Sequence, residues 1–295
     1  MQDLRYARAS NVADAVRLLA DGGPTARILA GGTDVIVQAR ERTREISLFV
    51  DVKHVPEAMA LRSANGAGLS IGAATPCYRI YGDSDVQRDY PALVDAASLI
   101  GGTAIQGRAS LGGNLCNASP AADGVPPLIA LGATAVVAGP GGERRLPAEE
   151  FATGPSQNVL GTGEILVSLE IPAPQPSSGA RFLRFIPRNE MDIAVVNVAS
   201  ALRFEDETVA EARVVVGAAA PTALLVEEAA QALVGQPLTD ETIAGAAAAA
   251  RAAVRPIDDM RGSVKQRRHL AGVLTERTLR DAARRARGEE VVSHP

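Results

Sequence analysis

A glycine pair followed by small polar residues occurs twice in this chain, and it constrains the fold more than any other feature. The first pair, Gly31-Gly32, lies in LAGGTDVIVQAR (29–40), between an apolar segment and a pattern with helical spacing. The second lies in RASLGGNLCNASPAAD (108–123). Because glycine lets the backbone approach a ligand closely and successive N–H groups can converge on an anion, each pair suits a pyrophosphate. A tight turn explains either pair as well, and the residues alone leave both interpretations open.

Neither pair belongs to a common nucleotide-binding fingerprint. The chain contains no GxGxxG turn and no GxxxxGK[ST] loop, so nicotinamide or ATP bound in those ways is not supported. A net charge of -4 and the absence of tryptophan argue against nucleic-acid binding. Cys77 and Cys116 are too few for an iron–sulfur cluster, which takes four thiolates. His54, His269 and His294 lack the spacing and the acidic neighbours of a metal site.

The opening residues of the chain and its longest uncharged runs predict a cytoplasmic protein. The opening residues MQDLRYARASN contain an acid and no apolar segment, so they do not resemble a secretory signal. The uncharged run 126–142 is too short to span a membrane and is interrupted by glycine and proline.

Residues 1–55 are predicted to form a compact βαβ-like lobe, which we call the N-terminal lobe. Ser10 is a plausible N-cap for a helix whose apolar residues recur at helical spacing until Gly22-Gly23. RILA (27–30) and LFVDV (48–52) are typical of strands, and the segment after the first glycine pair is expected to be helical to about Arg42.

Residues 56–175 form the next unit, the middle lobe. Strands are predicted at 69–76 and 164–172, a helix is expected to start at Pro91, and Pro140-Gly141-Gly142 indicates a hairpin. The segment APQPSSG (173–179) is the best linker in the sequence, so we expect a domain boundary there.

Residues 180–288 are predicted to form a C-terminal domain, followed by a tail at 289–295. ARFLRFIPR, IAVVNVASALRF and ARVVVGAA are three strands able to pair as an antiparallel meander. One helix is expected to begin near Thr239, and a second to run from about Leu274 to Gly288. The arginines of the second helix are most simply explained as a solvated face.

Several of these stretches together resemble one family. LAGGTDVIVQAR and RASLGGNLCNASPAADGVPPLIALGA are similar to the two signature stretches of the FAD-binding medium subunits of molybdenum hydroxylases, which include xanthine, carbon monoxide and nicotinate-type dehydrogenases. EILVSLEIP, FLRFIPRNEMDIAVVNVASAL and IDDMRGSVKQRRHL resemble later parts of the same family in the same order. The resemblance therefore covers nearly the whole chain.

The resemblance implies an α+β fold, with a two-lobed FAD-binding domain (PCMH/vanillyl-alcohol-oxidase-like) and a C-terminal three-stranded antiparallel sheet with helices. It also implies the residues that hold FAD. In the first glycine stretch, the residues expected to bind FAD are Leu29, Ala30, Gly31, Gly32, Thr33, Asp34 and Val35. In the second stretch, they are Ser110, Gly112, Gly113, Asn114 and Asn117. Asp123 is expected to accept a hydrogen bond from a ribityl or ribose hydroxyl, Leu166 to pack on the isoalloxazine, and Arg184 to lie near the flavin, where a cation favours the reduced anionic ring.

Three of these residues have simpler explanations. Asp123 can cap a helix that starts near Gly124, since aspartate is a favoured N-cap. Leu166 can be an ordinary core residue of a strand. Arg184 can be a surface charge. Cys116, which is not one of the expected FAD residues, is best explained as a small buried residue.

The chain departs from the family at a few positions. Gln106 replaces an arginine that usually precedes the second glycine stretch, and Gln266 replaces a tyrosine of the C-terminal motif. A contact made by either side chain in the family is therefore in doubt here. The cysteine-rich insertion of the benzoyl-CoA reductase branch is absent, which disfavours that branch.

The implied function is an electron-transfer subunit of a molybdenum hydroxylase. FAD in this chain is expected to take electrons from [2Fe-2S] clusters of a small subunit, while a large subunit carries molybdopterin-molybdenum. The expected assembly is a dimer of heterotrimers. The acceptor is NAD+, a quinone or oxygen. A free-standing reductase of the UDP-N-acetylmuramate reductase fold and a structural subunit without flavin are the alternatives.

Overall fold

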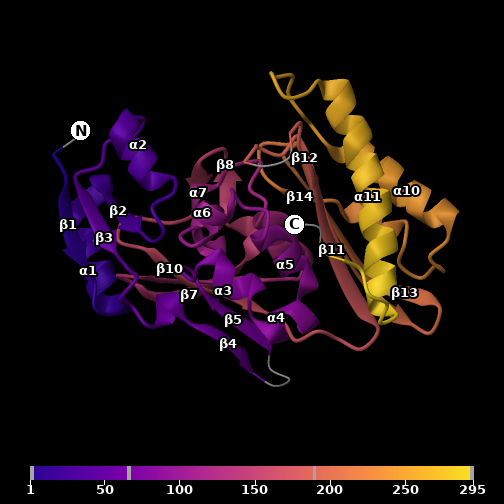
Figure 1. Ribbon diagram of the computed structural model, residues 1–295, viewed down its shortest axis with the longest axis horizontal. Coiled ribbons are helices and arrows are strands. Elements are labelled where there is room, and N and C mark those ends of the chain that lie inside the picture. Colours follow the sequence, from indigo (N-terminus) through magenta and orange to yellow (C-terminus); the bar gives the residue numbers. More distant parts are fainter. Residues whose placement is uncertain (1–2, 65–67, 189–190, 293–295) are drawn as a thin grey trace.

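The computed structural model of the chain describes residues 3–64, 68–188 and 191–292. The N-terminal lobe, the middle lobe and the C-terminal domain follow one another along the long axis of the molecule (Figure 1). Within the described residues, no helix is long and apolar enough to cross a membrane.

The N-terminal lobe is built on a 3-stranded parallel sheet in the order β1-β3-β2. Its elements are β1 (Arg5–Arg8), α1 (Val12–Gly22), β2 (Ala26–Leu29), α2 (Val35–Glu41) and β3 (Leu48–Asp51). The N-cap of α1 is Asn11, whose side chain accepts a hydrogen bond from the Asp14 N–H, so the prediction of Ser10 was wrong. The Ser10 hydroxyl bonds the Asp14 carboxylate instead.

The middle lobe contains a 5-stranded antiparallel sheet in the order β4-β5-β10-β6-β7. The strands are β4 (Leu61–Ala64), β5 (Gly68–Gly72), β6 (Thr134–Gly139), β7 (Gly142–Pro147) and β10 (Ile165–Ile171), and β8 (Ala152–Gly154) pairs with β9 (Gln157–Asn158) in a small separate sheet. The predicted hairpin joins β6 to β7, and Pro172 ends β10 as expected.

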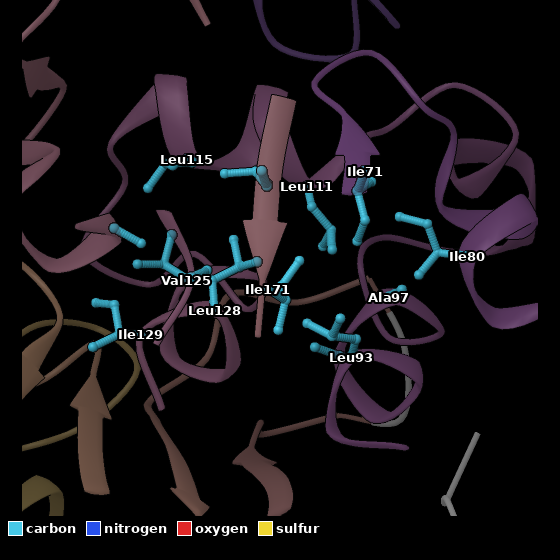
Figure 2. Close-up of a cluster of buried hydrophobic side chains, with 14 of the residues drawn as sticks. Ile71, Ile80, Leu93, Ala97, Leu111, Leu115, Val125, Leu128, Ile129 and Ile171 are labelled. Carbon is cyan, nitrogen blue, oxygen red and sulfur yellow. The ribbon is translucent and has the colours of Figure 1, made fainter. Parts of the chain in front are cut away.

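Short helices cover the middle sheet and enclose its core. They are α3 (Cys77–Tyr81), α4 (Ser84–Asp89), α5 (Pro91–Ala97), α6 (Thr103–Gln106), α7 (Leu111–Asn117) and α8 (Val125–Ala130). Figure 2 shows Leu111 of α7, Leu128 of α8 and Leu93 of α5 around Ile171 of the sheet, with Leu115 of α7 further along the same core, above Val125. The helix that carries the second glycine pair, α7, is therefore fixed by the main core.

The C-terminal domain has three long antiparallel strands, as predicted, and one short additional strand. They are β11 (Ser178–Phe185), β12 (Val196–Glu205), β13 (Thr208–Gly217) and β14 (Leu224–Leu225), and the helices are α9 (Glu227–Gln231), α10 (Asp240–Ala253) and α11 (Val264–Ala286). A helix was predicted to begin near Thr239, and α10 begins at Asp240 with Thr239 as its N-cap. Strand β12 is contacted by two helices, α11 of its own domain and α8 of the middle lobe. The first five residues of β12 are therefore all buried, instead of alternating between buried and exposed.

The last helix is longer than the sequence indicated. It begins at Val264, with Ser263 as its N-cap, and not near Leu274. The predicted start relied on apolar spacing, but the first turns of α11 bury Arg267, which is 3% exposed. Its guanidinium donates to the carbonyls of Val195 and Ala218 at 2.5 and 3.0 Å, so a charged residue occupies a core position there.

The middle lobe and the C-terminal domain meet in a contact that we call the joint, and buried charges fill it. Asp95 of α5 lies 2.9 Å from Arg181 Nη1 and 2.7 Å from Arg285 Nη1. Asp95 and Arg181 are each 2% exposed. Asp95 also accepts a hydrogen bond from the backbone N–H of Phe182 at 3.2 Å, so strand, helix and middle lobe are tied to a single carboxylate.

Candidate functional site

A cleft of about 640 Å³ opens between the N-terminal and middle lobes. Its size falls within the range of cofactor pockets, roughly 300–1,000 Å³. The cleft brings together most of the predicted site residues from both glycine stretches. They are Ala30, Gly31, Gly32, Thr33, Asp34, Val35, Ser110, Gly112, Gly113, Asn114, Asn117 and Leu166.

The two glycine stretches touch each other at this cleft. Arg108 Nε donates to the carbonyl of Gly31 at 3.2 Å, and Asn117 Nδ2 donates to Asp34 Oδ1 at 3.2 Å. Gln38 Nε2 in turn donates to Asn117 Oδ1 at 3.3 Å. Segments far apart in the sequence therefore form one continuous wall.

Within each pair, the two glycines do different things. A Cβ on Gly31 would lie 1.8 Å from the carbonyl oxygen of Arg108, and one on Gly112 would lie 2.4 Å from that of Ala73. These glycines are required by close packing of the protein against itself. A Cβ on Gly113 would meet only Ser110 Oγ, at 3.0 Å, so Gly113 leaves space that belongs to the cleft. Gly32 has a positive φ of 81°, which glycine adopts readily.

The first glycine loop presents free hydrogen-bond donors to the cleft. Among the described residues, none accepts a hydrogen bond from the N–H groups of Gly31, Gly32 or Thr33. The loop leads directly into α2, where the Ile36 N–H already bonds the Gly32 carbonyl at 3.2 Å, so the free donors are those of the loop itself. Such a row of donors fits an anion such as a pyrophosphate, and so fits FAD.

Two arginines at the cleft were not singled out from the sequence. Arg27 and Arg44 both line it, and Arg44 Nη2 donates to the carbonyl of Ser156 at 2.9 Å, across from the N-terminal to the middle lobe. Burial lowers the pKa of Arg27, and the nearby charge of Arg44 lowers it further. Neither arginine lies in a glycine stretch, so no local pattern indicated it.

Three predicted residues are not among the described residues that line the cleft: Leu29, Asp123 and Arg184. Leu29 is buried in a small cluster with Ala39, Ile46 and Phe49. Asp123 and Arg184 form a buried pair at the joint, with 2.5 Å between Arg184 Nη1 and Asp123 Oδ2.

The surroundings of Asp123 and Arg184 rule out a helix cap for Asp123 and a surface charge for Arg184. Asn197 Nδ2 donates to its second oxygen at 2.9 Å, and the N-cap position of α8 is Gly124, with no side-chain cap. Asp123 is therefore not a helix cap, and Arg184, with a side chain 6% exposed, is not a surface charge. Burial raises the pKa of Asp123, while Arg184 and Asn197 act in the opposite direction.

Leu166 and Cys116 each combine a structural position with a place on the cleft wall. Leu166 is 3% exposed and belongs to the core of the middle lobe, so it is both a core residue and a cleft residue. Cys116 is half-buried, and burial raises the pKa of its thiol to about 12. A thiol with that pKa is protonated at neutral pH and is not a nucleophile.

The departures from the family pattern have a structural explanation at one position. Gln106 is buried in the middle lobe, where its amide donates to the Ser98 carbonyl at 2.7 Å and its oxygen accepts from Tyr81 at 3.1 Å. Gln266 is exposed on the first turn of α11.

The part of the chain that the structure describes contains no group of three or more His, Cys, Asp or Glu suited to a metal. His54 and His269 are exposed, and His294 lies outside the described residues.

Comparison with known proteins identifies the class to which this fold and cleft belong. Residues 2–174 match the family described as the FAD binding domain in molybdopterin dehydrogenase. Residues 181–282 match the C-terminal domain of the CO dehydrogenase flavoprotein. The chain therefore belongs to the family of FAD-binding medium subunits of molybdenum hydroxylases, which are oxidoreductases.

Individual relatives agree over the full length. The xanthine dehydrogenase FAD-binding subunit of Escherichia coli O157:H7 is 35% identical over 286 residues, which cover 96% of this chain and 97% of the relative. The structure is similar to a carbon monoxide dehydrogenase from Hydrogenophaga pseudoflava that lacks the Mo-pyranopterin moiety of its cofactor, with a TM-score of 0.92, 31% identity and coverage of 97% and 98%. Quinoline 2-oxidoreductase from Pseudomonas putida 86 has a TM-score of 0.88 at 30% identity, with coverage of 97% and 99%. The predicted family, fold class and flavin cofactor are thus confirmed.

Proposed function

We propose that this chain is the FAD-carrying electron-transfer subunit of a multi-subunit enzyme. In this role it receives electrons one at a time from [2Fe-2S] clusters of a partner chain and delivers them in pairs to NAD+, a quinone or oxygen. Flavin supplies the ability to exchange one or two electrons, and the protein binds and tunes it. The chain's two cysteines are too few to hold a cluster, which supports a partner as the electron donor.

One observation carries the proposal: two glycine stretches from different lobes meet at one cleft, and the N–H groups of Gly31, Gly32 and Thr33 in the first stretch have no acceptor among the described residues. We propose that Gly31, Gly32 and Thr33 hold the pyrophosphate together with the second stretch around Gly113. Leu166 supplies an apolar surface for a flat ring. Three further residues do not line the cleft but stabilise the elements that form its wall: Leu29, Asp123 and Arg184.

The domain limits follow the same division. We propose that residues 1–55 and 56–175 are the two lobes that hold FAD, that 180–288 form a separate C-terminal domain, and that 289–295 are a tail. The last two residues of the linker 173–179 already belong to β11, so the linker is short.

The expected partners are a molybdenum-binding large subunit and a small [2Fe-2S] subunit, in a dimer of heterotrimers. The relatives support this, since they include medium chains of carbon monoxide dehydrogenases and a solved carbon monoxide dehydrogenase that lacks the Mo-pyranopterin moiety of the molybdenum cofactor.

An absorption spectrum of the tagged chain, purified under native conditions from its own host, tests this proposal. We expect flavin bands together with the broad absorbance of iron–sulfur clusters, contributed by co-purified subunits. Flavin bands alone, with turnover of a nicotinamide substrate by the isolated chain, would favour the free-standing reductase. A colourless protein that also fails to take up added FAD would favour the structural subunit.

A further inference from the structure

Lys53 occupies an unusual position for a lysine in this chain. Lys53 and Lys265 are the only lysines among 30 basic residues, the rest being arginines. Lys53 follows β3, and its side chain is only 25% exposed. Its ammonium lies 2.6 Å from Asp51 Oδ1 and donates to the carbonyl of Ala30 at 3.1 Å. Ala30 is the residue directly before the first glycine pair.

Asp51 holds this lysine in place. The carboxylate is 4% exposed at the end of β3. Its Oδ1 also accepts a hydrogen bond from the Lys53 backbone N–H at 2.9 Å, and its Oδ2 accepts one from the Tyr6 hydroxyl at 2.6 Å. With the carboxylate fixed on both oxygens, the ammonium has little freedom to leave the Ala30 carbonyl.

The position of this carbonyl determines where the next N–H points. In a trans peptide, the C=O and N–H groups point in opposite directions, and the described chain contains no cis peptide. Because Lys53 binds the Ala30 carbonyl, the N–H of Gly31 is turned away from Lys53. Arg108 holds the next carbonyl, that of Gly31, at 3.2 Å, and so turns the N–H of Gly32 away from itself.

We propose that Lys53 is a positioning residue for the first glycine loop, fixing the peptide plane between Ala30 and Gly31 so that the Gly31 N–H is presented to the phosphate of the ligand. A glycine loop has many accessible backbone conformations, and ordering it on binding costs affinity. Lys53 removes part of this cost because it orders the loop beforehand. This inference rests on the proposed binding of FAD in the cleft.

The experiment measures FAD affinity by quenching of flavin fluorescence, alongside the thermal midpoint of the same full-length protein without ligand. Lys53→Met is expected to weaken FAD binding about tenfold, equivalent to about 1.4 kcal/mol. Lys53→Arg keeps a donor and a charge, so it is expected to restore most of the affinity. Lys265→Met, on the exposed first turn of α11, is the matched control and should bind as the wild type does.

A double variant separates positioning from simple stabilisation. Lys53→Met alone leaves the buried carboxylate of Asp51 without its cation, and this can lower stability. In Asp51→Asn/Lys53→Met the region is neutral, and the asparagine oxygen can still accept from Tyr6. We expect this variant to recover most of the thermal midpoint and to retain the weakened FAD binding. Wild-type affinity in the double variant would overturn the role of Lys53. A wild-type protein that binds no FAD would instead overturn the proposed function itself.

Discussion

The two places where the parts of this molecule meet are built in opposite ways. At the cleft, small residues and a few long polar contacts, such as Asn117 to Asp34 and Arg44 to the Ser156 carbonyl, leave space and free N–H groups. At the joint, the carboxylates of Asp95 and Asp123 are each saturated by arginines and other donors. Under the proposed function, the unsatisfied groups mark the surface that takes a ligand, and the satisfied ones mark the frame that supports it.

This difference predicts that substitutions at the two places have separable effects. A buried charge that loses its partner destabilises the fold strongly. A change of shape at an open wall instead lowers affinity for whatever occupies the cleft.

The largest effect is expected at the joint, for Asp95→Ala. The substitution leaves Arg181 and Arg285 buried without this carboxylate, and breaking a buried pair in this way costs about 3–5 kcal/mol. Urea unfolding measures the loss in free energy of unfolding. Asp240→Ala is the control, because Asp240 pairs with Arg280 on the surface with a side chain 88% exposed. Equal stability of the two variants would contradict the description of the joint.

Gly31→Ala is expected to have the next largest effect. The new Cβ would lie 1.8 Å from the Arg108 carbonyl, so the two walls of the cleft must move apart. Overpacking of this kind costs about 1–3 kcal/mol. The control is Gly107→Ala, where nothing lies within 4 Å of the added carbon. If thermal melting shows both variants to be as stable as the wild type, the close contact between the glycine stretches is not as described.

Gly113→Ala, a change at the cleft, should alter FAD binding more than folding. Its methyl group enters the cleft with only Ser110 Oγ nearby, at 3.0 Å. Alanine is favoured over glycine in a helix by about 1 kcal/mol, so the free energy of unfolding should not fall. FAD affinity should fall at least about tenfold, or about 1.4 kcal/mol. Full affinity in a stable Gly113→Ala protein would remove Gly113 from the binding wall.

The smallest effect is expected from the titration of Asp51, which lies behind the first glycine loop. Burial opposes its ionisation, but hydrogen bonds from Lys53 and Tyr6 outweigh burial and lower its pKa. A carboxyl with a lowered pKa in the folded state contributes stability above its unfolded pKa of about 3.9, and this stability is lost as the pH falls through the folded value. The thermal midpoint of the wild type should therefore drop more between about pH 5 and pH 3 than that of Asp51→Asn. Parallel pH profiles would contradict this account.

The sequence predicted the features that local patterns encode. The start of a helix near Thr239 and the three strands of the C-terminal domain depend on neighbouring residues, and the structure has them where expected. The start of α11 was missed because Arg267 is polar in the sequence yet fills a buried position.

Site residues whose roles depend on distant partners could not be predicted in the same way. Arg184 bonds Asp123, 61 positions away in the chain, and Arg44 bonds the Ser156 carbonyl, 112 positions away. The contact of Lys53 with Ala30 depends on the parallel pairing of β2 and β3. Only the three-dimensional arrangement separates residues that line the cleft from those that support it.

The most direct test of the cleft as the flavin site is a titration of the purified full-length chain, stripped of flavin, with FAD, monitored by flavin fluorescence. We expect saturable binding of one FAD per chain, weakened by Gly113→Ala and unaffected by Gly107→Ala. Failure of the folded protein to bind FAD, or equal binding by both variants, would contradict the assignment of the cleft as the flavin site.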